Sequence, residues 1–260
     1  MLIETVMRAA EPYLRGRTIR DAVIGISLVA VELDNGHIGV SYVLREDLEA
    51  GCSIFPYGRE IVGREAVDIA EWAISGGDSL QRGIGIASLS AASRAQSLDD
   101  CDSPERPFGM TLRKTDRVGM IGLIAPVEKM LRPRVNDIFV FDKGISLLGG
   151  DDSSIMPMEA QRETLPTCDI VIVSGTTMIN GSIDGILGMC SGAREIVMIG
   201  ASTPMFPSAF EGSGVTVLAG SWWKSENKAD IFRNITLACG ISALGDYAIK
   251  KSVRVTSYSP

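Results

Sequence analysis

The chain has 260 residues, of which 45% are hydrophobic and 22% charged, so it can form one large domain or two ordinary domains with a buried core. Its formal net charge of −7 argues against nucleic-acid binding and against an anionic membrane surface, because both require clustered lysine and arginine. No apolar run reaches the ~20 residues of a membrane-spanning helix, and residues 1–16 lack the basic start and apolar core of a signal peptide. We therefore expect a cytoplasmic protein with neither nucleic-acid nor membrane partners.

The first half of the chain predicts a helix, a hairpin and then further helices. Residues 1–14 have helical spacing of apolar positions, residues 22–33 read as one strand, and residues 38–43 return as its partner. Asn35-Gly36 between the two apolar runs is a strong hairpin signal. This order of elements is typical of an α+β domain.

Two helices are expected next, at residues 58–75 and 79–93, with Asp78 or Ser79 capping the second. The second helix contains Gly83 and Gly85, which suggests close packing or a near approach to another group. Small residues there, including Ser88 and Ser90, predict either one wall of a ligand cleft or packing alone.

Residues 97–109 are rich in acidic residues and proline, and we place a domain boundary there, giving domains 1–108 and 109–260. Beyond it, strands and helices alternate, which predicts an α/β domain with a parallel sheet covered on both faces. Strands are expected at 117–124, 137–142, 169–173, 195–199 and 215–219, and helices near 127–131, 157–164, 183–189, 207–210 and 227–238.

The strongest functional signal follows the apolar run 170–173, which predicts a buried strand. Small polar residues come directly after it: Ser174, Gly175, Thr176, Thr177 and Asn180. Open α/β sheets bind ligands where parallel strands end, and a helix N-terminus there offers N–H groups and partial positive charge. These residues predict a site for a phosphate, a carboxylate or a ribose hydroxyl. The alternative is that one hydroxyl merely caps the following helix.

Three further strand ends carry glycine or polar residues that we expect to line the same site: Gly122, Pro126, Asp142, Gly200, Ser202 and Thr203. The full Gly-x-Gly-x-x-Gly fingerprint is absent, so a dinucleotide redox role is not supported. Asp142 would accept a ribose hydroxyl or pair with Lys143. For the others the alternative is an ordinary turn.

Metal ligands are scarce. The five cysteines are widely spaced and form no Cys-x-x-Cys motif, so we expect buried free thiols rather than disulfides. His37 is the only histidine and follows a turn, which leaves no base for a Ser–His–Asp arrangement. The run 149–154 could bind a hard cation weakly, but its residues lack the ligand spacing of a calcium-binding loop. The alternative is a polar loop. No metal site is predicted.

Several segments resemble the heavy-metal-chelation family. They are residues 23–25, 39–42 and 85–91 in the first half, then 119–122, 168–181 and 200–204 in the second. The similarity covers nearly the whole chain, and Ser174–Thr177 with Asn180-Gly181 is its most specific part. The chain departs from the family at Ser90, where asparagine is common, so a different ligand preference is expected if that position touches the ligand.

The resemblance implies a small domain like the enolase N-terminal domain, followed by a Rossmann-like domain similar to those of methyltransferases. It also implies a cleft between them for a pterin-, flavin- or siderophore-like molecule. A nucleotide- or S-adenosylmethionine-like ligand is also compatible with the resemblance.

Two function classes remain open: a small-molecule enzyme, and a non-catalytic binder or carrier of a metal chelate. Turnover would distinguish them. Trp222 and Trp223 would stack a flat ring or cover a subunit contact, so a homo-oligomer also stays open.

Overall fold

The computed structural model describes residues 1–48, 55–144 and 155–255. Its first sheet is antiparallel, with the order β1 (Ile19–Ile24), β2 (Leu28–Leu33) and β3 (Ile38–Tyr42). All six residues of β2 are buried because helices cover both of its faces. Val29, Val31 and Leu33 pack into one core with α1 (Leu2–Leu14) and α4 (Ser79–Ser93).

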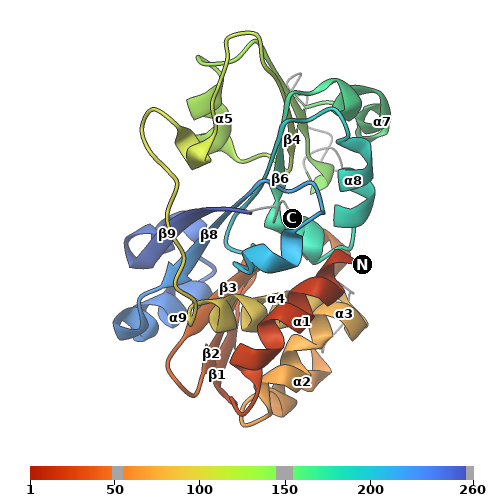
Figure 1. Cartoon of the computed structure of the whole chain (residues 1–260). Helices are drawn as coiled ribbons and strands as arrows, with labels where there is room; N and C mark the ends of the chain where they lie inside the picture. The colour runs from red at the N-terminus through yellow and green to blue at the C-terminus, as the bar shows by residue number, and fades with distance from the viewer. Residues whose placement is uncertain (49–54, 145–154, 256–260) are drawn as a thin grey trace.

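The opposite face of this sheet is covered by a helix from the far end of the chain, α9 (Lys228–Thr236). Leu28 and Ala30 of β2 share a core with Ile231 and Ile235 of that helix. Figure 1 shows α9, in blue, beside the red and orange strands of the first sheet. The first sheet is therefore completed by residues of the second half. The domain boundary near residue 108 stays a prediction.

The predicted hairpin turn is confirmed, but the prediction of a single strand over residues 22–33 is wrong. The chain turns between β1 and β2, where the Gly25 amide donates to the carbonyl of Leu28 at 2.9 Å. Gly25 lies so close to the carbonyl of Ile235 that any side chain would collide with it. The turn was missed because its flanking residues, Ile24 and Ile26, are apolar.

The helices of the first half follow the prediction in part. α1 and α4 are confirmed, and Asp78 caps α4 by accepting a hydrogen bond from the Gln81 amide at 2.7 Å. The helix predicted over residues 58–75 is instead two short helices, α2 (Ala66–Ala70) and α3 (Trp72–Ser75), after a 3-10 turn.

The second sheet has the order β5-β4-β6-β7-β8-β9. Its strands are β4 (Arg117–Ile121), β5 (Asp137–Phe141), β6 (Ile170–Ser174), β7 (Glu195–Ile199), β8 (Val217–Trp223) and β9 (Ala248–Arg254). The first five are parallel, and β9 pairs antiparallel with β8. The mixed α/β fold class predicted from the sequence is confirmed, whereas β9 was not predicted.

Successive residues of β6 face two different cores. Ile170 and Ile172 lie in a core with α5 (Ala125–Leu131), while Val171 and Val173 lie in the large core that also contains α1, α4 and α8 (Ile183–Met189). The remaining helix, α7 (Gln161–Thr164), precedes β6. The large core thus contains residues of both sheets.

Trp222 and Trp223 are both buried within the chain. The Trp222 indole N–H donates to the hydroxyl of Ser93 at 3.0 Å, and Arg94 lies over its ring. Trp223 packs in the core under α9. The structure therefore places both rings in the interior of the described chain.

Candidate functional site

The strand order of the second sheet changes direction at β4, which lies between β5 and β6. Ligands of open α/β sheets bind outside the carboxyl ends of the strands at such a point. Gly122 follows β4 with a φ of +81°, and a Cβ atom there would lie 3.0 Å from the Cβ of Ser174, the last residue of β6. The two predicted residues are therefore neighbours at this switch point.

Asp142 follows β5 at the same edge. Its carboxylate accepts a hydrogen bond from the Leu123 amide at 2.8 Å, and the carbonyl of Phe141 accepts one from the Gly122 amide at 2.7 Å. The end of β5 thus holds the turn after β4 in place. Pro126 is exposed in the first turn of α5.

Residues 174–180, here named the hydroxyl loop, begin with two hydroxyls in contact. The oxygens of Ser174 and Thr176 lie 2.8 Å apart, and both side chains are half-buried. Thr177 is buried, and its hydroxyl donates to the carbonyl of Ser174 at 2.7 Å. Ser174 and Thr176 therefore present their hydroxyls at the edge, while Thr177 shapes the turn.

The helix N-terminus expected behind these hydroxyls is a 3-10 turn of four residues, Gly175–Met178, whereas the helix predicted at residues 183–189 is confirmed as α8. Asn180 is exposed and its side-chain oxygen accepts hydrogen bonds from the amide and hydroxyl of Ser182. Gly181 then turns the chain with a φ of +72°, and α8 begins at Ile183. A helix dipole cannot contribute here, because the aligned peptide groups of a long helix are missing.

The second predicted strand end lies deeper in the molecule. A Cβ atom on Gly175 would come within 2.7 Å of the carbonyl carbon of Ser202, so this glycine permits close backbone contact. Ser202 is buried, and its hydroxyl accepts from the Tyr42 amide at 3.0 Å and lies 3.1 Å from the hydroxyl of Ser41. Thr203 is buried as well.

Ser202 therefore joins the second sheet to the end of β3 and presents no free hydroxyl to a ligand. The Thr203 hydroxyl has no hydrogen-bond partner in the part of the chain that the structure describes. Gly200 stays at the strand end, half-buried with a φ of +121°.

The residues predicted in α4 are buried in this structure. Ser88 is buried and its hydroxyl donates to the carbonyl of Ile84 at 3.1 Å. Ser90 is also buried. Gly85 allows α4 to touch the backbone of Ala73, where a side chain would collide. Packing thus accounts for Gly85 and Ser88, whereas the hydroxyl of Ser90 has no hydrogen-bond partner among the described residues.

Arg82 is the residue that the sequence analysis missed. It lies in the first turn of α4, and its Nε donates to the carbonyl of Ile179 in the hydroxyl loop at 2.7 Å. Its Nη1 donates to the carbonyl of Gly76 at 3.0 Å. The one sequence signal for it is a cation in the first turn of a helix, where the helix dipole disfavours positive charge.

Two cavities lie away from these residues. One of about 490 Å³ is lined by the start of α1, by α8 and by residues 209–213. The other, of about 350 Å³, runs between α1 and α2. Neither is lined by a residue that the sequence analysis singled out.

Soft-metal ligation finds little support in residues 1–48, 55–144 and 155–255, where no group of three or more His, Cys, Asp or Glu side chains is placed to hold an ion. Burial raises the pKa of the Cys168 and Cys190 thiols to about 11, so both are protonated at neutral pH and poor metal ligands. Burial lowers the pKa of His37, which lies in the β2–β3 turn beside Asn35. The run 149–154 lies outside the described residues.

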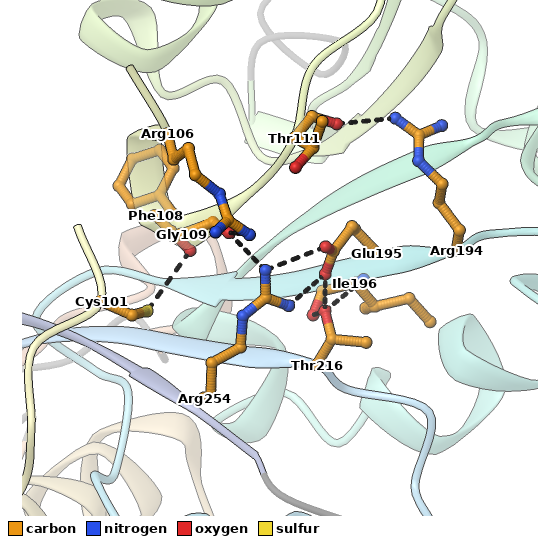
Figure 2. Close-up of polar contacts among 10 residues, drawn as sticks. All are labelled: Cys101, Arg106, Phe108, Gly109, Thr111, Arg194, Glu195, Ile196, Thr216 and Arg254. Carbon is orange, nitrogen blue, oxygen red and sulfur yellow. Dashed lines mark hydrogen bonds and ion pairs between the residues drawn. The ribbon is translucent and has the colours of Figure 1, made fainter. Parts of the chain in front are cut away.

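The opposite, amino edge of the second sheet is built from paired charges (Figure 2). Arg254 makes a bidentate contact with Glu195, with N–O distances of 2.7 and 3.0 Å, and Thr216 donates to the same carboxylate at 2.6 Å. Burial opposes ionisation of Glu195, but these hydrogen bonds outweigh it and lower the pKa of the carboxyl. Arg194 donates to the carbonyl of Thr111 at 3.0 Å.

Comparisons with known proteins agree with this architecture. A family model described as "Putative heavy-metal chelation" matches residues 107–254, and a second model with the same description matches residues 7–93. An uncharacterised protein of Methanocaldococcus jannaschii is 27% identical over 145 residues, which cover 55% of this chain and 54% of that protein. The chain thus aligns with about half the length of this curated relative.

Two crystal structures of proteins of unknown function from the DUF364 family are similar. The one from Pyrococcus horikoshii has a TM-score of 0.76 at 21% identity and covers 98% of this chain and 100% of its own. The one from Desulfitobacterium hafniense has a TM-score of 0.74 at 18% identity, with 96% and 99% covered. At such identities the likeness shows the fold alone.

No helix within the described ranges is both long and apolar enough to cross a bilayer.

The two family models together match both halves of the chain, and the resemblance predicted from the sequence is confirmed. The chain belongs to the family described as "Putative heavy-metal chelation".

Proposed function

We propose that this protein binds a small, oxygen-rich organic molecule at the carboxyl edge of the second sheet, beside the ends of the neighbouring strands β4 and β6. The observation that carries the proposal is the contact between Gly122 and Ser174 at the switch point. The hydroxyls of Ser174 and Thr176 and the carboxylate of Asp142 follow strands that end at this same edge. Small-molecule sites in open α/β sheets typically have a few polar groups that converge at the point where the strand order changes direction.

The donor set favours an organic ligand over a bare metal ion. The described residues at this edge supply hydroxyls and one carboxylate, and the described thiols of Cys168 and Cys190 are buried and protonated. Soft metals prefer thiolate and imidazole ligands. A link to metal biology, as the family description suggests, would therefore run through a ligand that supplies its own donor atoms, such as a siderophore-like chelator.

Binding without turnover is the candidate that the described edge favours. His37, the only histidine, lies in the β2–β3 turn, hydrogen-bonded to Asn35 at 3.3 Å. General acid–base chemistry at the hydroxyl loop would fall to Asp142, whose carboxylate already holds the Leu123 amide. If the protein instead acts on a pterin-, flavin- or nucleotide-like substrate, mass spectrometry after incubation with that substrate would detect a product.

Native mass spectrometry of the purified protein tests the proposal first, by identifying a co-purified small molecule. Calorimetric titration with adenosine monophosphate and with pterin-6-carboxylate follows, on the wild type and on the double variant Ser174→Ala/Thr176→Val. Loss of two hydrogen bonds should weaken binding by about 5-fold to 150-fold, since each contributes about 0.5–1.5 kcal/mol.

Thr167→Val is the matched control, because this exposed threonine precedes β6 at the opposite end of the strand. It should leave the affinity unchanged, and both proteins should unfold within about 1 kcal/mol of the wild type. Equal affinity of the double variant and the wild type for every bound molecule would count against the site.

A further inference from the structure

We infer that Arg82 recognises an anionic group, a carboxylate or a phosphate, on the molecule bound at the hydroxyl loop. This inference rests on the proposed function and adds the charge of the ligand to it. It concerns a residue of the first half of the chain that reaches the strand end of the second half.

Arg82 contacts the backbone of the hydroxyl loop directly. Its Nε donates to the carbonyl of Ile179 at 2.7 Å, and the amide of Ile179 donates to the carbonyl of Thr176 at 2.9 Å. Its Nη1 donates to Gly76 at 3.0 Å. These two carbonyls hold the guanidinium plane in place, while Nη2 makes no hydrogen bond to any described residue. A fixed guanidinium with a donor to spare is suited to binding carboxylate or phosphate oxygens.

The charge of Arg82 is also uncompensated within the described residues. The side chain is half-buried, and both of its hydrogen-bond partners are neutral carbonyls. By contrast, Arg194 and Arg254 at the amino edge each make bidentate contacts with a carboxylate. A partly buried cation without a counter-ion favours the arrival of an anion.

The position of Arg82 in α4 does not serve the helix. Asp78 caps α4, so Arg82 lies in the first turn, where the helix dipole favours anions and disfavours cations. An anion bound beside Arg82 would give this cation a role that the helix itself does not.

Two pairs of molecules that differ in one anionic group test the inference: adenosine against adenosine monophosphate, and pterin against pterin-6-carboxylate. In calorimetry the wild type should bind the anionic member of the recognised pair at least tenfold more tightly. Arg82→Met should abolish this preference, and Arg82→Lys should restore part of it, since a lysine keeps the charge but not the planar fork.

Arg94→Met is the matched control, because Arg94 follows the other end of α4 and should leave the preference intact. A structural role for Arg82 would weaken both members of a pair equally, so the ratio of the two affinities separates recognition from folding. Circular-dichroism melting establishes that each variant is folded. A variant Arg82→Met that keeps the preference for the anion would overturn the inference.

The inference and the proposed function fail in different ways. Equal affinity of the wild type for both members of each bound pair, with weaker binding by Ser174→Ala/Thr176→Val, rejects the role of Arg82 and keeps the site. A co-purified molecule that has neither carboxylate nor phosphate also rejects it. If none of the four molecules binds and no small molecule co-purifies, both the inference and the proposed function are contradicted.

Discussion

At the amino edge of the second sheet charged side chains neutralise one another, whereas at the carboxyl edge glycines and neutral hydroxyls follow the strands. Arg254 and Glu195 pair at the amino edge (Figure 2). Gly122 and Ser174 meet at the carboxyl edge, and the nearby cation Arg82 is held only by carbonyls. The same strands thus end in two different chemistries.

The difference indicates what each edge is for. Charges that are paired and partly buried have little left to offer a ligand, and removing one partner leaves the other unsatisfied. A glycine with positive φ, a pair of hydroxyls and an arginine without a carboxylate can all accept a new partner. The amino edge is thus suited to stabilising the sheet, and under the proposed function the carboxyl edge binds the ligand.

The largest effect should come from breaking the amino edge at Asp116, which is 1% exposed. Its carboxylate accepts from Arg194 at 2.9 and 2.6 Å and from the Arg113 amide at 2.7 Å. Asp116→Ala should lower the free energy of unfolding by about 3 kcal/mol, because a partly buried arginine loses its bidentate partner and keeps only the longer contact with Asp169 at 3.8 Å. Urea unfolding measures this loss.

The control for that variant is Asp68→Ala, which removes an exposed ion pair with Arg64 at 3.8 Å. Its effect on the free energy of unfolding should stay below about 0.5 kcal/mol. A loss below about 1 kcal/mol for Asp116→Ala would remove the contrast between the two edges.

A smaller effect is expected from Gly175→Ala at the carboxyl edge. The added methyl group would lie 2.7 Å from the carbonyl carbon of Ser202, so overpacking should cost about 1–3 kcal/mol in urea unfolding. Gly185→Ala in α8 is the matched control, because no atom lies within 4 Å of the added methyl group, and it should be neutral or slightly stabilising. Equal stability of the two variants would show that Gly175 is not needed for close packing.

The smallest effect is a difference in pH dependence at Glu195. Its pKa is lowered from the ordinary 4.5, so the ionised carboxylate stabilises the folded protein above that value, and the contribution is lost as the pH falls through the folded pKa. Glu195→Gln should therefore be less stable than the wild type at pH 7, and the gap should narrow as the pH falls below about 4.5. A gap that stays constant from pH 7 to pH 3 would show that Glu195 is not ionised by this pairing.

Local signals in the sequence accounted for much of the fold. The Asn35-Gly36 turn, the capping Asp78 of α4 and the apolar run of β6 each lie where the pattern predicts them. In the candidate site, local reasoning placed Gly122, Ser174 and Thr176 at strand ends. It did so because consecutive parallel strands bring their carboxyl ends to one edge.

Contacts between distant segments could not be predicted from local signals in the sequence. Ser202 has the same hydroxyl-rich context as Ser174, yet it is buried against Ser41 and Tyr42, 161 and 160 residues away. The strand β9 carries charged residues, including Lys250 and Lys251, so its sequence alone is typical of a surface segment. Its pairing with β8 is apparent only in the structure. Whether a hydroxyl meets solvent or another serine depends on which segments pack over it.

By itself, the sequence determined the parallel strands of the second sheet, the Asn35-Gly36 turn and the family, because these depend on residues that are close along the chain. Only the tertiary structure decided that the end of β3 covers Ser202 and that α9 covers one face of the first sheet. It alone brought Arg82 to the carbonyl of Ile179, 97 residues away. Burial and charge pairing are properties of the packed chain, and they separate a structural hydroxyl from one that can bind a ligand.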